Sequence, residues 1–155
     1  MNDSSTYSVS VQTVEPRPIA AVRARVPAGR VGALFKQYLD QVYAARSAGL
    51  QLDGQNIFVY RAVGEPAGVI DAEFGVGAKA PFTSVGSVVY TQVPSGEVAT
   101  ATHWGDYARL GAAHDAVVSW CRANGRKLSG TSWEVYGHWT GNPADQRTDV
   151  FYLLG

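Results

Sequence analysis

Residues 49–60 read GLQLDGQNIFVY, and 76 positions later residues 125–136 read GRKLSGTSWEVY. The two stretches share two glycines, a leucine and a final Val-Tyr pair at matching positions. The same offset relates Gly29 to Gly105. Agreement at a single offset over several small and apolar positions indicates that the chain contains two copies of one structural unit.

The first copy is predicted to have the pattern β-α-β-β. Alternating apolar residues predict strands over residues 19–26, 57–60 and 69–74. Between the first two strands, apolar residues over residues 30–48 follow the i, i+3, i+4, i+7 spacing of one helical face. Gly49 follows, where the end of a helix favours a residue that tolerates positive φ.

The second copy is predicted to repeat this pattern. Strands are expected over residues 97–104, 132–139 and 149–154, and a helix over about residues 107–124. Gly125 takes the place that Gly49 has in the first copy. The helix and its terminal glycine therefore recur in the same order in both copies.

The predicted fold is α+β, a tandem pseudo-symmetric repeat of two β-α-β-β units that pack together as one domain over residues 1–155. The units span about residues 14–80 and 92–155, and residues 1–13 are an N-terminal extension. Residues 88–90, in the connection between the units, are expected to form a short strand.

Composition limits the classes of function. Hydrophobic residues make up 46% of the chain, and 13 Lys and Arg balance 13 Asp and Glu. Such a chain, with no basic cluster, is a poor binder of nucleic acid, because phosphates require a concentrated basic face. No apolar run approaches the roughly 18 residues of a membrane span, and no signal-peptide pattern is present. We therefore expect a cytoplasmic protein with no direct nucleic acid binding and no membrane partner.

The sequence shows no motif for a cofactor or a metal. Cys121 is the only cysteine, so an intrachain disulfide is excluded, and its place in the predicted helix indicates a buried thiol. The histidines His103, His114 and His138 lack metal-ligand spacing. Glycine-rich phosphate loops and the Gly-x-Ser-x-Gly elbow do not occur in the sequence. We expect neither a cofactor nor a metal ion.

The stretch Trp133–Trp139 contains the residue that folding alone explains least. Alternation places Trp133 and Trp139 on one face of the predicted strand and Glu134 and Tyr136 on the other. Large rings on both faces indicate a strand covered on both sides, where a carboxylate is costly unless it is paired or hydrogen-bonded. Glu134 either attracts a cationic ligand, aided by cation–π contacts, or has a structural role beside an arginine or at a sheet rim.

Two further polar groups have simpler interpretations. His103 and Trp104 could position a pocket mouth, but a tight turn that requires Gly105 and is capped by His103 is favoured. Asp71 and Glu73 alternate with apolar residues, which predicts an ordinary solvent-facing side of a strand.

A series of short motifs runs in a fixed order from about Val14 to the end of the chain. They are Ile57-Phe-Val-Tyr60, Val69-Ile-Asp-Ala-Glu-Phe-Gly-Val76, Val93-Pro-Ser-Gly96, His103-Trp-Gly105 followed by Tyr-x-x-Leu, and Glu134-Val-Tyr136. In combination they resemble the GyrI-like domain, which also serves as the effector-binding domain of AraC-type and MerR-type multidrug regulators. The resemblance implies two pseudo-symmetric units that enclose a ligand cavity.

The resemblance also implies that Glu134 is the buried carboxylate that contacts the positive charge of lipophilic cations, with Tyr136 beside it. The offset of 76 places Phe58 and Tyr60 at the positions equivalent to these two residues. The other candidate ligand-binding residues share a large or polar ring: they are Trp139, Trp133, Tyr90, Tyr38, Trp104 and His103. Alternation leaves open which face of the Trp133–Trp139 strand lines the cavity.

The favoured function is a stand-alone module that binds hydrophobic, cationic or aromatic compounds. The alternative is a hydrolase of reactive cyclopropane-containing aromatic compounds, because some stand-alone relatives have this activity; Glu134 would be the base and Tyr136 the acid or orienting donor. Inhibition of a protein such as gyrase is less favoured, because such an inhibitor is expected to have an acidic, DNA-like surface, whereas this chain has no net charge. About a dozen residues precede the first strand, so transcriptional activity would need a separate regulator or protein partner.

Overall fold

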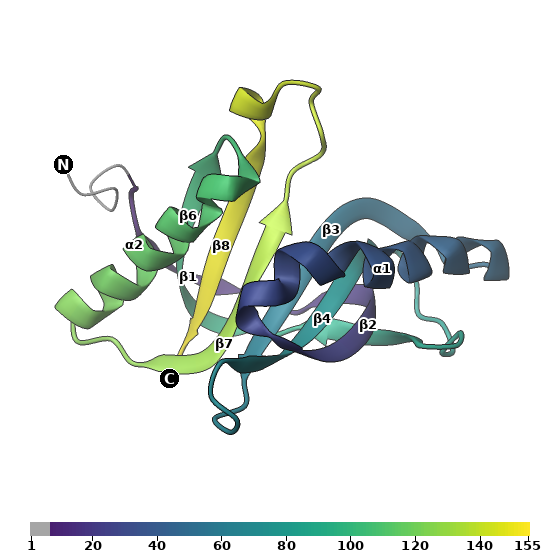
Figure 1. Cartoon of the computed structure of the whole chain (residues 1–155), viewed down its shortest axis with the longest axis horizontal. Coiled ribbons are helices and arrows are strands. Elements are labelled where there is room, and N and C mark those ends of the chain that lie inside the picture. The colour runs from purple at the N-terminus through teal and green to yellow at the C-terminus, as the bar shows by residue number, and fades with distance from the viewer. Residues whose placement is uncertain (1–6) are drawn as a thin grey trace. The chain divides into compact units, whose positions relative to one another are not determined.

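The computed structural model describes residues 7–155 and has a mixed α+β architecture, as predicted (Figure 1). The chain divides into two compact units. The N-terminal unit is Pro16–Val93, and the C-terminal unit combines the residues up to Glu15 with Pro94–Gly155. Among residues 7–155, each unit contains one α-helix and four strands.

In the N-terminal unit, four antiparallel strands run in the spatial order β3-β4-β2-β5. Their bounds are β2 (Arg17–Pro27), β3 (Leu52–Ala62), β4 (Val69–Ala78) and β5 (Val88–Val93). The predicted strands are confirmed, and the short strand expected at residues 88–90 is the beginning of β5.

The helix α1 (Val31–Ala44) connects β2 to β3 and packs against β2 and β4. A 3-10 turn continues it through Ala48, and Gly49 ends it with a φ of 102°. The helix and its glycine stop are therefore confirmed. The packed face is aromatic: Tyr38 stacks on Phe74 with ring centroids 5.2 Å apart.

In the C-terminal unit, four antiparallel strands run in the order β1-β6-β8-β7. Their bounds are β1 (Ser10–Val14), β6 (Gly96–Trp104), β7 (Leu128–Tyr136) and β8 (Arg147–Leu154). Strand β1 was assigned to an extension by the sequence analysis. Its sequence, SVQTV, is largely polar and its residues are exposed or half-buried, so it lacks the apolar alternation of a covered strand.

The two units have the same strand order when one is read from β3 and the other from β7. The fourth strand differs, because β5 follows the other strands of its unit along the chain whereas β1 precedes those of its own. Descent from a duplicated sequence and the ligand cavity stay predictions.

The helix α2 (Leu110–Ala123) covers one face of the C-terminal sheet and packs against β6 and β8 (Figure 1). Ala101, Val117 and Val150 belong to the apolar core between the helix and the sheet. Cys121 is buried in this core, as predicted, and burial raises the pKa of its thiol. Among the described residues, no helix is long and apolar enough to cross a membrane.

One prediction for the N-terminal unit is wrong. Asp71 is half exposed and pairs with Arg25, but the side chain of Glu73 is only 5% exposed. Two arginines cover it: Arg23 Nε lies 2.8 Å from one carboxylate oxygen and Arg61 Nη1 lies 2.9 Å from the other. Alternation identified the face of β4 correctly but could not show that long side chains from β2 and β3 fold over it.

We predict that Glu73→Gln lowers the free energy of unfolding by about 1–2 kcal/mol, because two arginines lose the carboxylate that they share. The figure is modest because both guanidinium groups are partly solvated. Urea unfolding measures it. Asp71→Asn is the matched control and should cost less, since both members of that pair face water; an equal loss in the two variants would contradict the prediction.

Candidate functional site

Glu134 lies on the face of β7 that α2 covers. It pairs across the sheet with Val150, a residue of the core beneath α2, and it is 6% exposed. Trp133 points to the opposite face, where it is buried and stacks on Phe151 with ring centroids 5.6 Å apart. Trp133 and Glu134 therefore do not share a face of the sheet, as their alternation requires.

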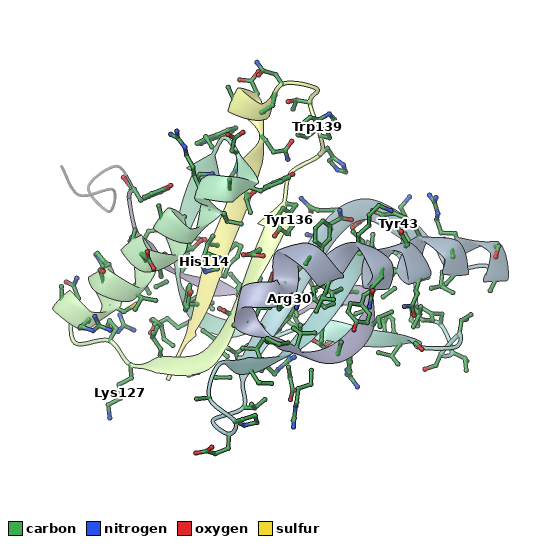
Figure 2. The ribbon with its side chains drawn as sticks, viewed as in Figure 1. Arg30, Tyr43, His114, Lys127, Tyr136 and Trp139 are labelled. Atoms are coloured by element: carbon green, nitrogen blue, oxygen red, sulfur yellow. The ribbon has the colours of Figure 1, made fainter. Side chains whose placement is uncertain are left out.

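Both oxygens of the Glu134 carboxylate accept short hydrogen bonds. The hydroxyl of Tyr136, two residues along the strand, donates to Oε1 at 2.6 Å. Nε2 of His114, from α2, lies 2.6 Å from Oε2. Figure 2 shows His114 and Tyr136 on these two elements of the C-terminal unit. The carboxylate thus links the helix to the last residues of the strand.

A second tyrosine holds the other side of the His114 ring. The hydroxyl of Tyr152, in β8, lies 2.7 Å from His114 Nδ1, and the two rings meet edge to face. Burial, with a further contribution from the negative charge of Glu134, raises the pKa of Tyr152 to about 12. Tyr152 therefore keeps its proton at neutral pH.

The direction of these hydrogen bonds follows from the chemistry of the groups. An ionised carboxylate can only accept, so the proton between His114 and Glu134 belongs to Nε2. In a neutral imidazole Nδ1 is then the acceptor, and it receives the proton of Tyr152. With a neutral imidazole, both the Tyr136 and the His114 hydrogen bonds to the Glu134 carboxylate come from uncharged groups. We call these four residues, Glu134, Tyr136, His114 and Tyr152, the Glu134 network.

His114 is the member that sequence reasoning missed as a partner of Glu134, because it was considered only as a metal ligand. A usable signal was present: Leu110, Ala113, Val117 and Cys121 form the buried face of α2, and His114 falls on the same face by helical spacing. A histidine on a buried face needs polar partners, and Glu134 was the unexplained carboxylate. Within residues 7–155, no group of three or more His, Cys, Asp or Glu is arranged to hold a metal ion.

Tyr107, just before α2, extends the site beyond the predicted residues. Its ring meets that of Tyr136 edge to face, with centroids 5.4 Å apart, while its side chain remains partly exposed. Partial burial raises the pKa of its phenol. An aromatic surface therefore adjoins the Tyr136 end of the Glu134 network.

Other predicted residues of the C-terminal unit lie elsewhere. Trp139 follows the end of β7 and is 62% exposed. Trp104 is 60% exposed and lies beneath the guanidinium of Arg147. His103 is buried and its ring bonds to the Tyr7 hydroxyl at 2.9 Å and to the carbonyl of Asp106 at 2.8 Å.

The His103-Trp104-Gly105 segment is a turn, as favoured from the sequence. Gly105 has a φ of 118°, a conformation that side chains disfavour, and the His103 ring spans the turn to Asp106. His103 and Trp104 also line an open hollow of about 770 Å³ on the C-terminal unit, together with Arg109 and Asp115. Glu134 is not among the residues that line this hollow.

The remaining predicted residues belong to the N-terminal unit. Phe58 and Tyr38 both contact Phe74, and Phe58 is 4% exposed, so these rings form part of the core beneath α1. Tyr90, in β5, packs edge to face against Phe82. Tyr60 is half-buried in β3. Their roles in ligand binding stay predictions.

Comparison with known families decides what this architecture is. The model of the GyrI-like small molecule binding domain matches residues 7–153, nearly the whole chain. The chain belongs to the GyrI-like family. The resemblance inferred from the short motifs is therefore confirmed. A search of the curated proteins gives no significant match.

Solved structures agree with the GyrI-like fold. The C-terminal domain of EcmrR aligns with a TM-score of 0.76 at 18% identity, covering 96% of this chain and 98% of that one. SAV2435 bound to tetraphenylphosphonium aligns at 0.72 and 7% identity, with 96% and 94% covered. A structure described as a hydrolase from Listeria innocua aligns at 0.62 and 10% identity, with 95% and 91% covered. At such identities the likeness concerns the fold alone.

We predict that the free energy of unfolding falls as pH rises from about 10 to about 12. Tyr152 has a folded pKa above its ordinary value of 10.0, so its contribution is complete below about pH 10 and is lost as the pH rises through 12. Urea unfolding at a series of pH values measures this loss, which Tyr152→Phe should reduce. Tyr107→Phe is the control, because burial shifts that pKa less; an unchanged pH profile in Tyr152→Phe would contradict the prediction.

Proposed function

We propose that this GyrI-like domain binds hydrophobic cationic or aromatic compounds, with Glu134 as the group that attracts positive charge. The observation that carries the proposal is the 6% exposure of a carboxylate whose partners, Tyr136 and His114, contact it at 2.6 Å. A buried negative charge interacts strongly with a nearby cation, because little water screens it.

The aromatic residues around the carboxylate support the same class of ligand. The rings of Tyr136 and Tyr107 are in contact, and each can offer a π face or edge to an aromatic compound. A cation over a tyrosine ring gains up to about 2 kcal/mol where water is excluded. SAV2435, which has this fold, is a structure with tetraphenylphosphonium bound, and this compound combines a positive charge with four aromatic rings.

The predicted rings of the N-terminal unit remain part of the proposal. Phe58, Tyr60, Tyr38 and Tyr90 stay candidate ligand-binding residues of their own unit, whereas Trp133 lies on the face of β7 opposite to Glu134. The related EcmrR has been seen in complex with DNA.

We predict that Glu134→Gln weakens binding of tetraphenylphosphonium about tenfold or more, because the amide keeps the shape of the side chain but removes its charge. Isothermal titration calorimetry or quenching of tryptophan fluorescence measures the dissociation constant. Trp139→Ala is the matched control: this exposed ring lies beyond the end of β7, and we expect little change. Undiminished binding by Glu134→Gln would exclude Glu134 as the cation partner.

A second candidate is hydrolysis of strained, cyclopropane-containing aromatic compounds. The observation that favours it is the hydrogen bond from Tyr136 to Glu134, which places an acid and a base 2.6 Å apart. Glu134 would take a proton from a water molecule while the oxygen of that water bonds to a carbon of the cyclopropane ring. A ring bond of that same carbon would break as the new carbon–oxygen bond forms, and Tyr136 would give its proton to the neighbouring carbon that keeps the electron pair, while the proton on Glu134 replaces it. Water is thereby added across the broken bond.

Product analysis by mass spectrometry distinguishes the two candidates. If the domain is a hydrolase, we expect a product heavier than the substrate by one water, formed with turnover, and rate losses of about 100-fold or more in Glu134→Gln and Tyr136→Phe. If it only binds, tryptophan quenching saturates and no product accumulates. Turnover that persists in Glu134→Gln would contradict the catalytic assignment.

A further inference from the structure

The contacts of the Glu134 carboxylate restrict the kind of cation that it can bind. Oε1 already accepts a hydrogen bond from Tyr136, and Oε2 accepts one from His114. An ionised carboxylate has roughly four acceptor positions, and each of these two donors occupies one of them. Both bonds are short and join groups that are at least partly buried.

We propose that His114 is a specificity-determining residue, which makes this site favour cations without N–H donors, such as quaternary ammonium and phosphonium ions, over primary ammonium ions. The inference rests on the proposed function. It adds that a residue of α2, rather than the carboxylate alone, selects among cations.

The discrimination follows from hydration. A primary ammonium ion is a compact, strongly hydrated charge with three N–H donors. Its transfer into a buried site is unfavourable unless acceptors in the site replace the water that it loses. Because His114 takes up acceptor capacity at Oε2, less is left for those donors. A quaternary or phosphonium ion has no N–H groups to satisfy, so it keeps the full charge attraction and the contact with aromatic rings.

Tyr152 supports this role by fixing the ring of His114. Its hydroxyl bonds to Nδ1 at 2.7 Å, which leaves Nε2 as the nitrogen that faces Glu134. The pair is enclosed, since the side chains of His114 and Glu134 are 20% and 7% exposed. Tyr152 is thus a positioning residue that acts on the ligand only through His114.

A matched pair of ligands tests the inference directly. The probes are 1-pyrenylmethyl-trimethylammonium and 1-pyrenylmethylammonium, which have the same aromatic group and charge but differ in N–H donors. Their dissociation constants are measured by pyrene fluorescence at one fixed pH near 8. In the unmodified protein, we expect the quaternary ion to bind about tenfold more tightly, the size of one charge-assisted hydrogen bond that the primary ion cannot replace.

Three variants separate the hydrogen bond from other effects of the side chain. His114→Ala removes the hydrogen bond from His114 to Oε2 and opens space, so the preference for the quaternary ion should fall about tenfold. His114→Gln keeps an N–H donor and should retain the preference. Tyr152→Phe removes only a hydroxyl and should give an intermediate ratio, which provides the test if His114→Ala does not fold. Circular dichroism confirms the fold of each variant.

The outcomes distinguish failure of this inference from failure of the proposed function. If the ions bind but their affinity ratio is the same in the unmodified protein, His114→Ala and Tyr152→Phe, His114 does not set specificity, whereas the proposed function stands. If neither these ions nor tetraphenylphosphonium bind the unmodified protein, the proposed function fails and the inference fails with it.

Discussion

The buried carboxylate of Glu134 is the constraint on which the arrangement of the C-terminal unit depends. Ionised groups are rarely retained inside proteins without compensation, and here a phenol and an imidazole provide it through two hydrogen bonds of 2.6 Å. The partners come from β7 and α2, so the same contacts that stabilise the charge also fix the helix against the strand. Tyr152 extends the set to β8. The hydrogen bonds of the Glu134 network therefore connect α2, β7 and β8 around one carboxylate.

The fold makes the Glu134 network possible because α2 covers one face of the neighbouring strands β7 and β8. Val150 and Tyr152 alternate along β8 toward α2, and Glu134 and Tyr136 do so along β7. Tyr136 and Tyr152 pack against the apolar core that contains Val117. Polar side chains at buried positions give less hydrophobic stabilisation than apolar side chains would. The presence of Glu134 beside this core is therefore more readily explained by function than by stability.

Periodicity in the sequence predicted both helices and the strands β2 to β8 of the described residues, and it singled out Glu134, but it did not identify the partners of Glu134. Alternation over Trp133–Trp139 identified Glu134 as an anomalous carboxylate, and the family motifs gave it a role. Strand β1 was missed because hydrogen bonding to β6, rather than burial of apolar side chains, defines it. Helical spacing could place His114 on the buried face of α2, but it could not identify Glu134 and Tyr152 as its partners, because these contacts join α2, β7 and β8. Partners of this kind depend on tertiary packing.

The buried carboxylates of Glu73 and Glu134 differ in the charge of their partners. Glu73 lies between the guanidinium groups of Arg23 and Arg61, so two positive charges more than cancel its own. Glu134 is held by a phenol and a histidine, which stabilise the carboxylate through hydrogen bonds without cancelling its charge when the imidazole is neutral. Burial alone would rank the two residues together, at 4% and 6% exposed. The chemistry of their partners separates them: Glu73 pairs with two guanidinium groups, whereas Glu134 accepts hydrogen bonds from a phenol and an imidazole, which is the arrangement on which the proposed binding of a cation rests.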